Sequence, residues 1–186
     1  MSVFRKRLKR FKNWLHRYDG GQRLVAGKGK QMENDKWFPF ILEYFNQGAK
    51  TLTINLKGRS MRPFLESDRD KALLAPIGEV KVGDPVLAEN FPGHFVLHRI
   101  VKLEGDDVTL MGDGNLTYEY CKLKDLRASV IGFYRKGNKK LDRTDGMKWK
   151  TYSWIWMHLR PIRRYLLAFY RYVWLNIFRL KSPKNK

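Results

Sequence analysis

The most constraining feature of the sequence is the stretch GRSMRP at residues 58–63. Apolar and polar residues alternate just before it, at 51–57, in the pattern of a half-buried β-strand. Gly58 can adopt backbone angles that other residues rarely reach, and Pro63 fixes the chain just past Ser60. The stretch therefore predicts a strand that ends in a tight turn presenting a serine hydroxyl. Because serine is common in turns, a functional interpretation needs support from elsewhere in the chain.

Short strands separated by turns are expected from residue 51 to about 135. The predicted strands are 51–57, 71–77, 85–90, 94–103, 107–111 and 127–135. A short helix is expected before them, with Pro39 in its first turn and Gly48 at its end. Many short strands at this spacing predict a mainly β fold with flanking helices, built on an antiparallel, barrel-like body.

The two ends of the chain differ from this body. Residues 1–18 repeat apolar side chains at helical spacing beside a basic face, which predicts an amphipathic helix, and 20–30 is a glycine-rich linker. Charges interrupt the first segment throughout, so it is not a secretory signal. The sequence thus divides into an N-terminal helix and linker at 1–30, a central domain at 31–136, and a basic spacer with a helical tail at 137–186.

The tail from 149 to 186 interleaves tryptophans and arginines. Its apolar runs are too short to cross a bilayer, which takes about 20 predominantly apolar residues. Aromatic rings and arginines together suit the headgroup layer of a membrane, and arginines are rare in buried helices. We expect an amphipathic helix on a membrane surface; the alternative is a terminal helix packed on the barrel.

Charge and cysteine content constrain partners and compartment. The 186 residues include 38 Lys and Arg against 18 Asp and Glu, a net charge of +20, which points to an anionic partner. The basic residues concentrate at the ends and in the 135–150 spacer, which favours an anionic membrane over nucleic acid. A single cysteine, Cys121, fits a reducing compartment. We expect a cytoplasmic, peripherally membrane-associated protein with no cofactor or metal.

Three further positions could provide chemistry beside Ser60. His98 lies in a mostly apolar predicted strand, Asp113 lies in the turn at 111–115 (MGDGN), and Glu119 follows shortly after. Each alone is a weak signal, since a histidine in such a strand is more often structural. Together they supply a nucleophile, a base and one or two acids on neighbouring β elements, in the order Ser, His, Asp/Glu.

Four boxes give the chain a family resemblance. GxSMxP at 58–63, KVGD at 81–84, VLHRI at 96–100 and GDxN at 112–115 occur in the order and spacing of the signal-peptidase and LexA-type serine peptidases. The likeness covers about 85 residues, 52 to 135. Because His98 occupies the position where the bacterial signal peptidase and LexA branches have a lysine base, the chain is most similar to the serine-histidine branch of endoplasmic-reticulum and archaeal signal peptidases.

This resemblance implies cleavage of a peptide substrate by acyl transfer. Ser60 is then the nucleophile and His98 the general base, with the Ser60 backbone N–H as an oxyanion donor. Glu119 or Asp113 orients the histidine; the paired aspartates of the histidine branch are replaced by Tyr118-Glu119 here. We expect Met61 and Pro63, which flank the serine, to contact the substrate.

Two alternatives remain at this stage. The sequence shows neither the N-terminal span of most signal peptidases nor the helix-turn-helix of LexA-type repressors, which leaves the substrate open. A self-cleaving, LexA-like protein predicts a scissile bond upstream, and Ala26-Gly27 fits that pattern loosely. A non-catalytic module that binds nucleic acid would also use the positive charge.

Overall fold

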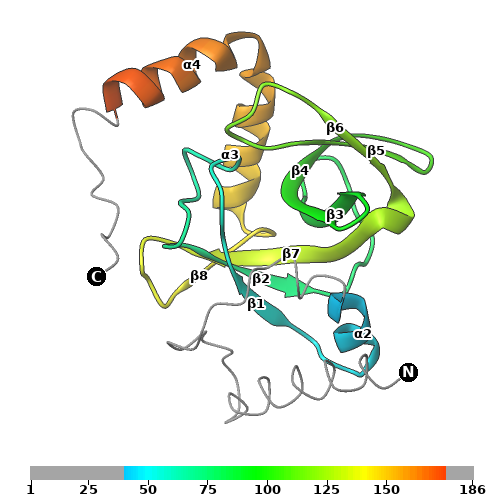
Figure 1. The fold of residues 1–186 in the computed structure, drawn as a ribbon. Helices are drawn as coiled ribbons and strands as arrows, with labels where there is room; N and C mark the ends of the chain where they lie inside the picture. Colours follow the sequence, from blue (N-terminus) through cyan, green and yellow to red (C-terminus); the bar gives the residue numbers. More distant parts are fainter. Residues whose placement is uncertain (1–39, 175–186) are drawn as a thin grey trace.

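The computed structural model describes residues 40–174. Its centre is one antiparallel sheet of eight strands in the order β1-β2-β7-β3-β4-β5-β6, with β8 paired to β7 (Figure 1). The strands are β1 Leu52–Asn55, β2 Lys71–Ala75, β3 Pro85–Phe91, β4 His94–Glu104, β5 Asp107–Met111, β6 Glu119–Lys122, β7 Leu126–Tyr134 and β8 Leu141–Arg143. The mainly β, antiparallel prediction is confirmed at this level.

The sheet is not a closed barrel. Within residues 40–174, no ladder joins β1 to β6, the two ends of the strand order. Several ladders shift register, for example between Ile100 and Lys102 on β4, and such irregularities bend a sheet. The bend brings the strands from β3 to β6 round on themselves while β1, β2 and β7 run beneath them (Figure 1).

Two apolar clusters hold the sheet together. One gathers β1, β2, β7 and the helix α2 (Ile41–Asn46), with Ile41, Leu74 and Phe133 almost inaccessible. The other joins β3, β4 and β5 around Val86, Ile100 and Leu110. Alternation accounts for β2, in which every second residue is buried. The expected helix around Phe45 is present as α2.

The loop from 56 to 70, which contains Ser60, is closed at its base by the backbone. Leu56 N–H donates to Asp70 O, and Asp68 N–H donates to Leu56 O. The Asp70 carboxylate is fully buried and accepts the backbone N–H groups of Glu66 and Lys136. Gly58 has a φ of 91°, as the sequence predicted for this turn. This loop at 56–70, the serine loop, is therefore anchored to β2 and to the segment after β7. The part of it around Ser60 is the serine turn.

The C-terminal part of the described chain packs on the body. It consists of α3 (Met147–His158), a 3-10 turn, α4 (Arg163–Phe169) and a π-helical turn at Tyr170–Trp174. Trp149 and Trp156 are buried, and Arg163 is only 2% exposed. The expectation that the arginines of this tail all lie at a surface is wrong for Arg163. The first part of the tail thus follows the alternative, a terminal helix packed against the sheet.

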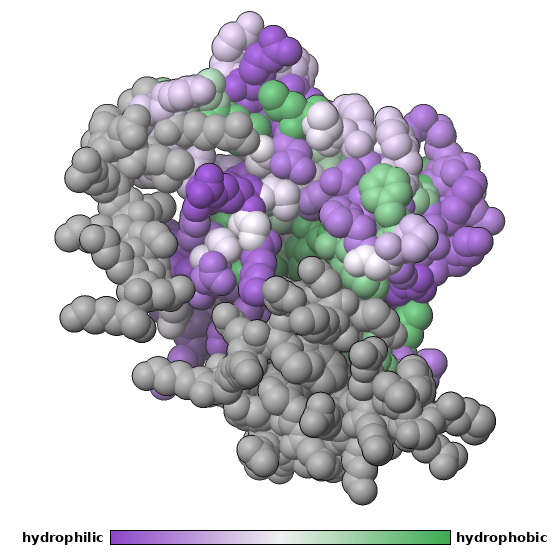
Figure 2. Space-filling model, viewed as in Figure 1, coloured by the Kyte–Doolittle hydropathy of each residue, from purple (hydrophilic) through white to green (hydrophobic). Residues whose placement is uncertain are grey.

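The expected spacer at 137–148 also joins the sheet, because β8 pairs with β7 across Phe133 and Asp142. The predicted N-terminal helix, the linker and the Ala26-Gly27 bond lie outside the described residues. In the part of the chain that the structure describes, no helix is long and apolar enough to cross a membrane. Figure 2 shows a hollow with a hydrophobic floor at the centre of one face.

Candidate active site

Ser60 lies in the turn that follows β1, and it is partly exposed. Among the described residues, neither its hydroxyl nor its backbone N–H makes a hydrogen bond. Its backbone carbonyl does, accepting the N–H of Gly114 at 2.7 Å. The turn is therefore fixed through the carbonyl, and no residue between 40 and 174 forms a hydrogen bond with the hydroxyl or the N–H. The N–H of Gly58 is used, because it donates to the Ser67 hydroxyl.

The loop at 112–115, between β5 and β6, packs closely against the serine turn. A Cβ on Gly112 would lie 2.5 Å from Ser60 O and 3.0 Å from His98 Nε2. A Cβ on Gly114 would lie 2.8 Å from Arg62 O and 2.9 Å from Arg59 O. Real Cβ atoms do not come this close to backbone oxygen, so both positions require glycine. The absence of two side chains lets the serine turn and His98 approach the same point.

His98 lies on β4 and is 2% exposed. Its Nδ1 is 3.1 Å from Oε2 of Glu119, at the start of β6. A carboxylate only accepts hydrogen bonds, so Nδ1 carries the proton and donates it to Glu119. In the neutral ring, the other nitrogen, Nε2, is then the one without a proton, and it lies on the side of Gly112 and Ser60. This tautomer and orientation are those that a general base beside the serine requires.

Glu119 receives a second hydrogen bond, from Nδ2 of Asn90 at 3.0 Å to the same Oε2. Asn90 Oδ1 in turn lies 2.5 Å from Nδ1 of His94. The pKa of Glu119 is held below its ordinary value, first by the hydrogen bond from His98 and further by the nearby His94 and Asn90, against an opposing effect of burial. The carboxylate that faces His98 is therefore ionised at neutral pH.

Asp113 has a different partner. Its carboxylate forms a two-pronged ion pair with Arg99, with Nε to Oδ1 at 3.0 Å and Nη2 to Oδ2 at 2.8 Å. Both residues are 1% exposed. Burial acts to lower the pKa of Arg99, but the charge and hydrogen bonds of Asp113 outweigh it and the pKa is raised. Of the two acids that the sequence left open, Glu119 contacts the histidine and Asp113 neutralises the neighbouring arginine.

The KVGD box supports the same arginine. Asp84 accepts the backbone N–H of Lys81, closing a turn in which Gly83 has a φ of 102°. The Gly83 carbonyl then accepts a hydrogen bond from Arg99 Nη1 at 2.8 Å. The box thus has a structural function at the back of the site.

The two residues expected to contact substrate lie in the serine turn. Met61 is 6% exposed and belongs to the apolar core, so its side chain has a packing function. Pro63 is partly buried, in a turn that contains a cis bond after Arg62.

The structure therefore brings together Ser60, His98 and Glu119, with Asp113 behind them. Sequence reasoning missed Asn90, which is 29 residues from Glu119 in the chain. It also missed the residues of α3 that contact Asp113. Neither set forms a motif, and only the fold makes them neighbours. No cluster of three metal-binding side chains occurs within residues 40–174.

No protein family model matches this chain, and the comparison with curated proteins found no match.

Proposed function

We propose that the protein is a serine endopeptidase of the signal-peptidase and LexA type, with Ser60 as nucleophile, His98 as general base and Glu119 as the orienting acid. One observation carries the proposal: the Ser60 backbone and His98 Nε2 both pack against the bare face of Gly112. The bond between His98 Nδ1 and Glu119 supports it, because it leaves Nε2 free to accept a proton.

In the proposed reaction, Ser60 Oγ attacks the carbonyl carbon of a peptide bond while His98 Nε2 accepts the hydroxyl proton. Glu119 stabilises the imidazolium that forms. The Ser60 N–H, which has no acceptor within the described residues, donates to the developing oxyanion. The intermediate collapses to an acyl-serine as the imidazolium protonates the leaving amine, and water, activated by the same histidine, releases the acid. The substrate class is a leader or propeptide.

The direct test is covalent labelling of the serine. A fluorophosphonate should modify wild-type protein at Ser60, as located by peptide mass spectrometry, and should not modify Ser60→Ala or His98→Ala. Ser67 lies in the same loop, where its hydroxyl accepts the N–H of Gly58, and it provides the matched control. Ser67→Ala should be labelled like wild type. Labelling that persists in His98→Ala, or that maps to another serine, would contradict the assignment.

We also propose that the peptidase works at an anionic membrane surface. Large apolar side chains on the C-terminal helices are exposed, among them Trp154 at 62% and Tyr165 at 70%. Others are Ile155, Ile162, Phe169, Tyr172 and Trp174. Exposed Arg164 lies beside Tyr165, and aromatic rings interspersed with arginine favour the headgroup layer of anionic lipid.

A further inference from the structure

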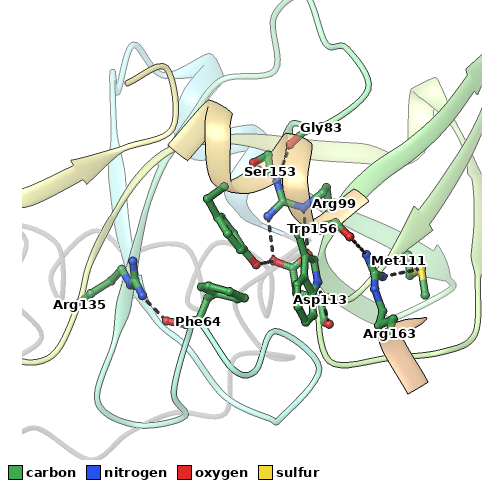
Figure 3. Close-up of polar contacts among 10 residues, drawn as sticks. Phe64, Gly83, Arg99, Met111, Asp113, Arg135, Ser153, Trp156 and Arg163 are labelled. Atoms are coloured by element: carbon green, nitrogen blue, oxygen red, sulfur yellow. Dashed lines mark hydrogen bonds and ion pairs between the residues drawn. The ribbon is translucent and has the colours of Figure 1, made fainter. Parts of the chain in front are cut away.

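Side chains of α3 hold Asp113, the second residue of the loop at 112–115. Tyr152 donates its hydroxyl hydrogen to Asp113 Oδ2 at 2.9 Å, and Trp156 donates its indole N–H to the Asp113 carbonyl at 3.1 Å. Ser153, between them, accepts a hydrogen bond from Arg99 Nη1. The close-up in Figure 3 shows Ser153 beside Arg99 and Trp156 beside Asp113. One helix thus binds both the carboxylate and the backbone of Asp113.

Met111, which precedes Gly112, is also held by the C-terminal segment that contains α3 and α4. Arg163, at the start of α4, contacts Met111 with Nη1 to Sδ at 3.0 Å. Its Nη2 donates to the carbonyl of Trp156 at 2.7 Å, and its guanidinium lies over the Trp156 ring. Met111 and Asp113, the two neighbours of Gly112, are therefore each held by the C-terminal segment (Figure 3).

The Tyr152 hydroxyl stays protonated and therefore remains a hydrogen-bond donor to Asp113. Burial and the adjacent Asp113 charge raise its pKa far above the ordinary value, despite the opposing charge of Arg99. The ring packs on Phe64 of the serine loop, with ring centroids 3.7 Å apart, and on Trp149. Tyr152 therefore contacts the serine loop and the 112–115 loop at once.

We propose that α3 is a positioning element of the catalytic site and that Tyr152 is its positioning residue, fixing Asp113 so that the 112–115 loop holds Ser60 beside His98. Two hydrogen bonds link Tyr152 to Ser60. Tyr152 donates to Asp113, and the N–H of the next residue, Gly114, donates to Ser60 O at 2.7 Å. The expected effect on catalysis rests on the proposed function, whereas the expected effect on the 112–115 loop does not.

Tyr152→Phe tests the proposal because it removes one hydroxyl and keeps the ring. The matched control is Thr151→Val, which removes a hydroxyl from the adjacent, exposed residue of α3. The first readout is hydrogen exchange at the Gly114 amide, followed by NMR. We expect exchange roughly tenfold faster in Tyr152→Phe, corresponding to one lost hydrogen bond to a charged group, and unchanged in Thr151→Val. Trp156→Phe, which removes the indole donor, should act in the same direction.

The second readout is turnover of a reporter peptide. In Tyr152→Phe we expect kcat to fall between roughly 10- and 100-fold with KM unchanged, because a small misplacement of reacting groups affects the chemical step rather than binding. Unchanged exchange and kcat in Tyr152→Phe, or equal effects of Thr151→Val, would overturn the proposal.

Failure of the proposed function gives a separate result. If wild-type protein is neither labelled at Ser60 nor active, the peptidase assignment fails and the exchange measurement alone decides the positioning role. Faster exchange confined to Tyr152→Phe and Trp156→Phe would support it, and exchange equal to wild type would overturn it.

Discussion

His98 and Arg99, consecutive residues on β4, pair with different carboxylates. His98 Nδ1 lies 3.1 Å from Glu119, and Arg99 Nη2 lies 2.8 Å from Asp113. Successive side chains of a strand point to opposite faces, so one dipeptide supplies the proposed base on one face and a buried structural cation on the other. The two acids near the site therefore have separate functions, which mutation can distinguish.

Exchanging each acid for its amide should separate catalysis from stability. Glu119→Gln should lower kcat roughly 100-fold, since the histidine loses its orienting charge, while the free energy of unfolding changes little. Asp113→Asn should lower the free energy of unfolding by about 3 to 5 kcal/mol, because Arg99 is left buried and unpaired. Denaturant titration and steady-state kinetics on both variants provide the check. A larger loss of stability in Glu119→Gln than in Asp113→Asn would reverse the assignment.

Gly112→Ala should abolish activity. The added methyl group would lie 2.5 Å from Ser60 O and 3.0 Å from His98 Nε2, so the serine turn has to move away from the base, at a cost in stability of about 1 to 3 kcal/mol. Gly78→Ala is the control, since nothing lies within 4 Å of its Cβ position and its φ is not positive. Fluorophosphonate labelling and melting temperature measure both effects; full labelling of Gly112→Ala would refute the geometry.

Asn90→Ala should reduce kcat by less than Glu119→Gln does, with KM unchanged. Its amide donates to the same Glu119 oxygen that faces His98, so the variant leaves the carboxylate in place with one fewer anchor. Asn46→Ala, at the exposed end of α2, is a control remote from this pair. Peptide turnover measures the effect, and equal kcat values for wild type and Asn90→Ala would remove Asn90 from the site.

The serine loop should contribute pH-dependent stability through Asp70. Burial acts to raise the pKa of Asp70, but hydrogen bonds from Arg69, Glu66 and Lys136 outweigh it and hold the pKa below the ordinary value. Folding therefore favours the ionised form, and this stabilisation is present above about pH 4 and lost as the pH falls through the folded-state value. The stability difference between wild type and Asp70→Asn should shrink between pH 7 and pH 3. A difference that stays constant with pH would contradict this linkage.

Membrane binding should depend on exposed rings rather than on the whole tail. Trp154→Ser with Tyr165→Ser should weaken binding to vesicles that contain anionic phosphatidylserine, and high salt should weaken binding of the wild-type chain. Removal of residues 149–186 is an unsuitable test, because Trp149 and Trp156 are buried and the truncation would disturb the fold. Binding that persists in the double variant and in high salt would argue against a membrane role, and equal affinity for an oligonucleotide would favour nucleic acid.

Much of the sheet could be predicted from local pattern, because β1 alternates apolar and polar residues and β4 is a mostly apolar run bounded by turn residues. The pattern failed at β6 and β8. β6 alternates only between half-buried and exposed residues at the end of the sheet, and β8 has three residues, none of them buried. Neither strand buries an apolar face, so neither gives the periodic signal on which a prediction depends.

The site was predictable only where motifs carry it. Ser60, His98 and Asp113 are candidates because they lie in the boxes, and Glu119 because it follows the last box, whereas the choice between the two acids required coordinates. The burial of Arg163 could not be predicted, because its contact with Met111, 52 residues away in the chain, depends on the tertiary fold. A buried arginine cannot be distinguished from an exposed one by residue type, because the difference depends on tertiary contacts.

The contacts from α3 to Asp113 span 39 and 43 residues of sequence, and this separation sets an order of events during synthesis. A ribosome delivers the serine turn, the histidine strand and Glu119 before it delivers the helix that braces them. Contacts of such long sequence separation form late in folding. We therefore expect the proposed site to stay unassembled in a nascent chain until α3 has emerged from the ribosome.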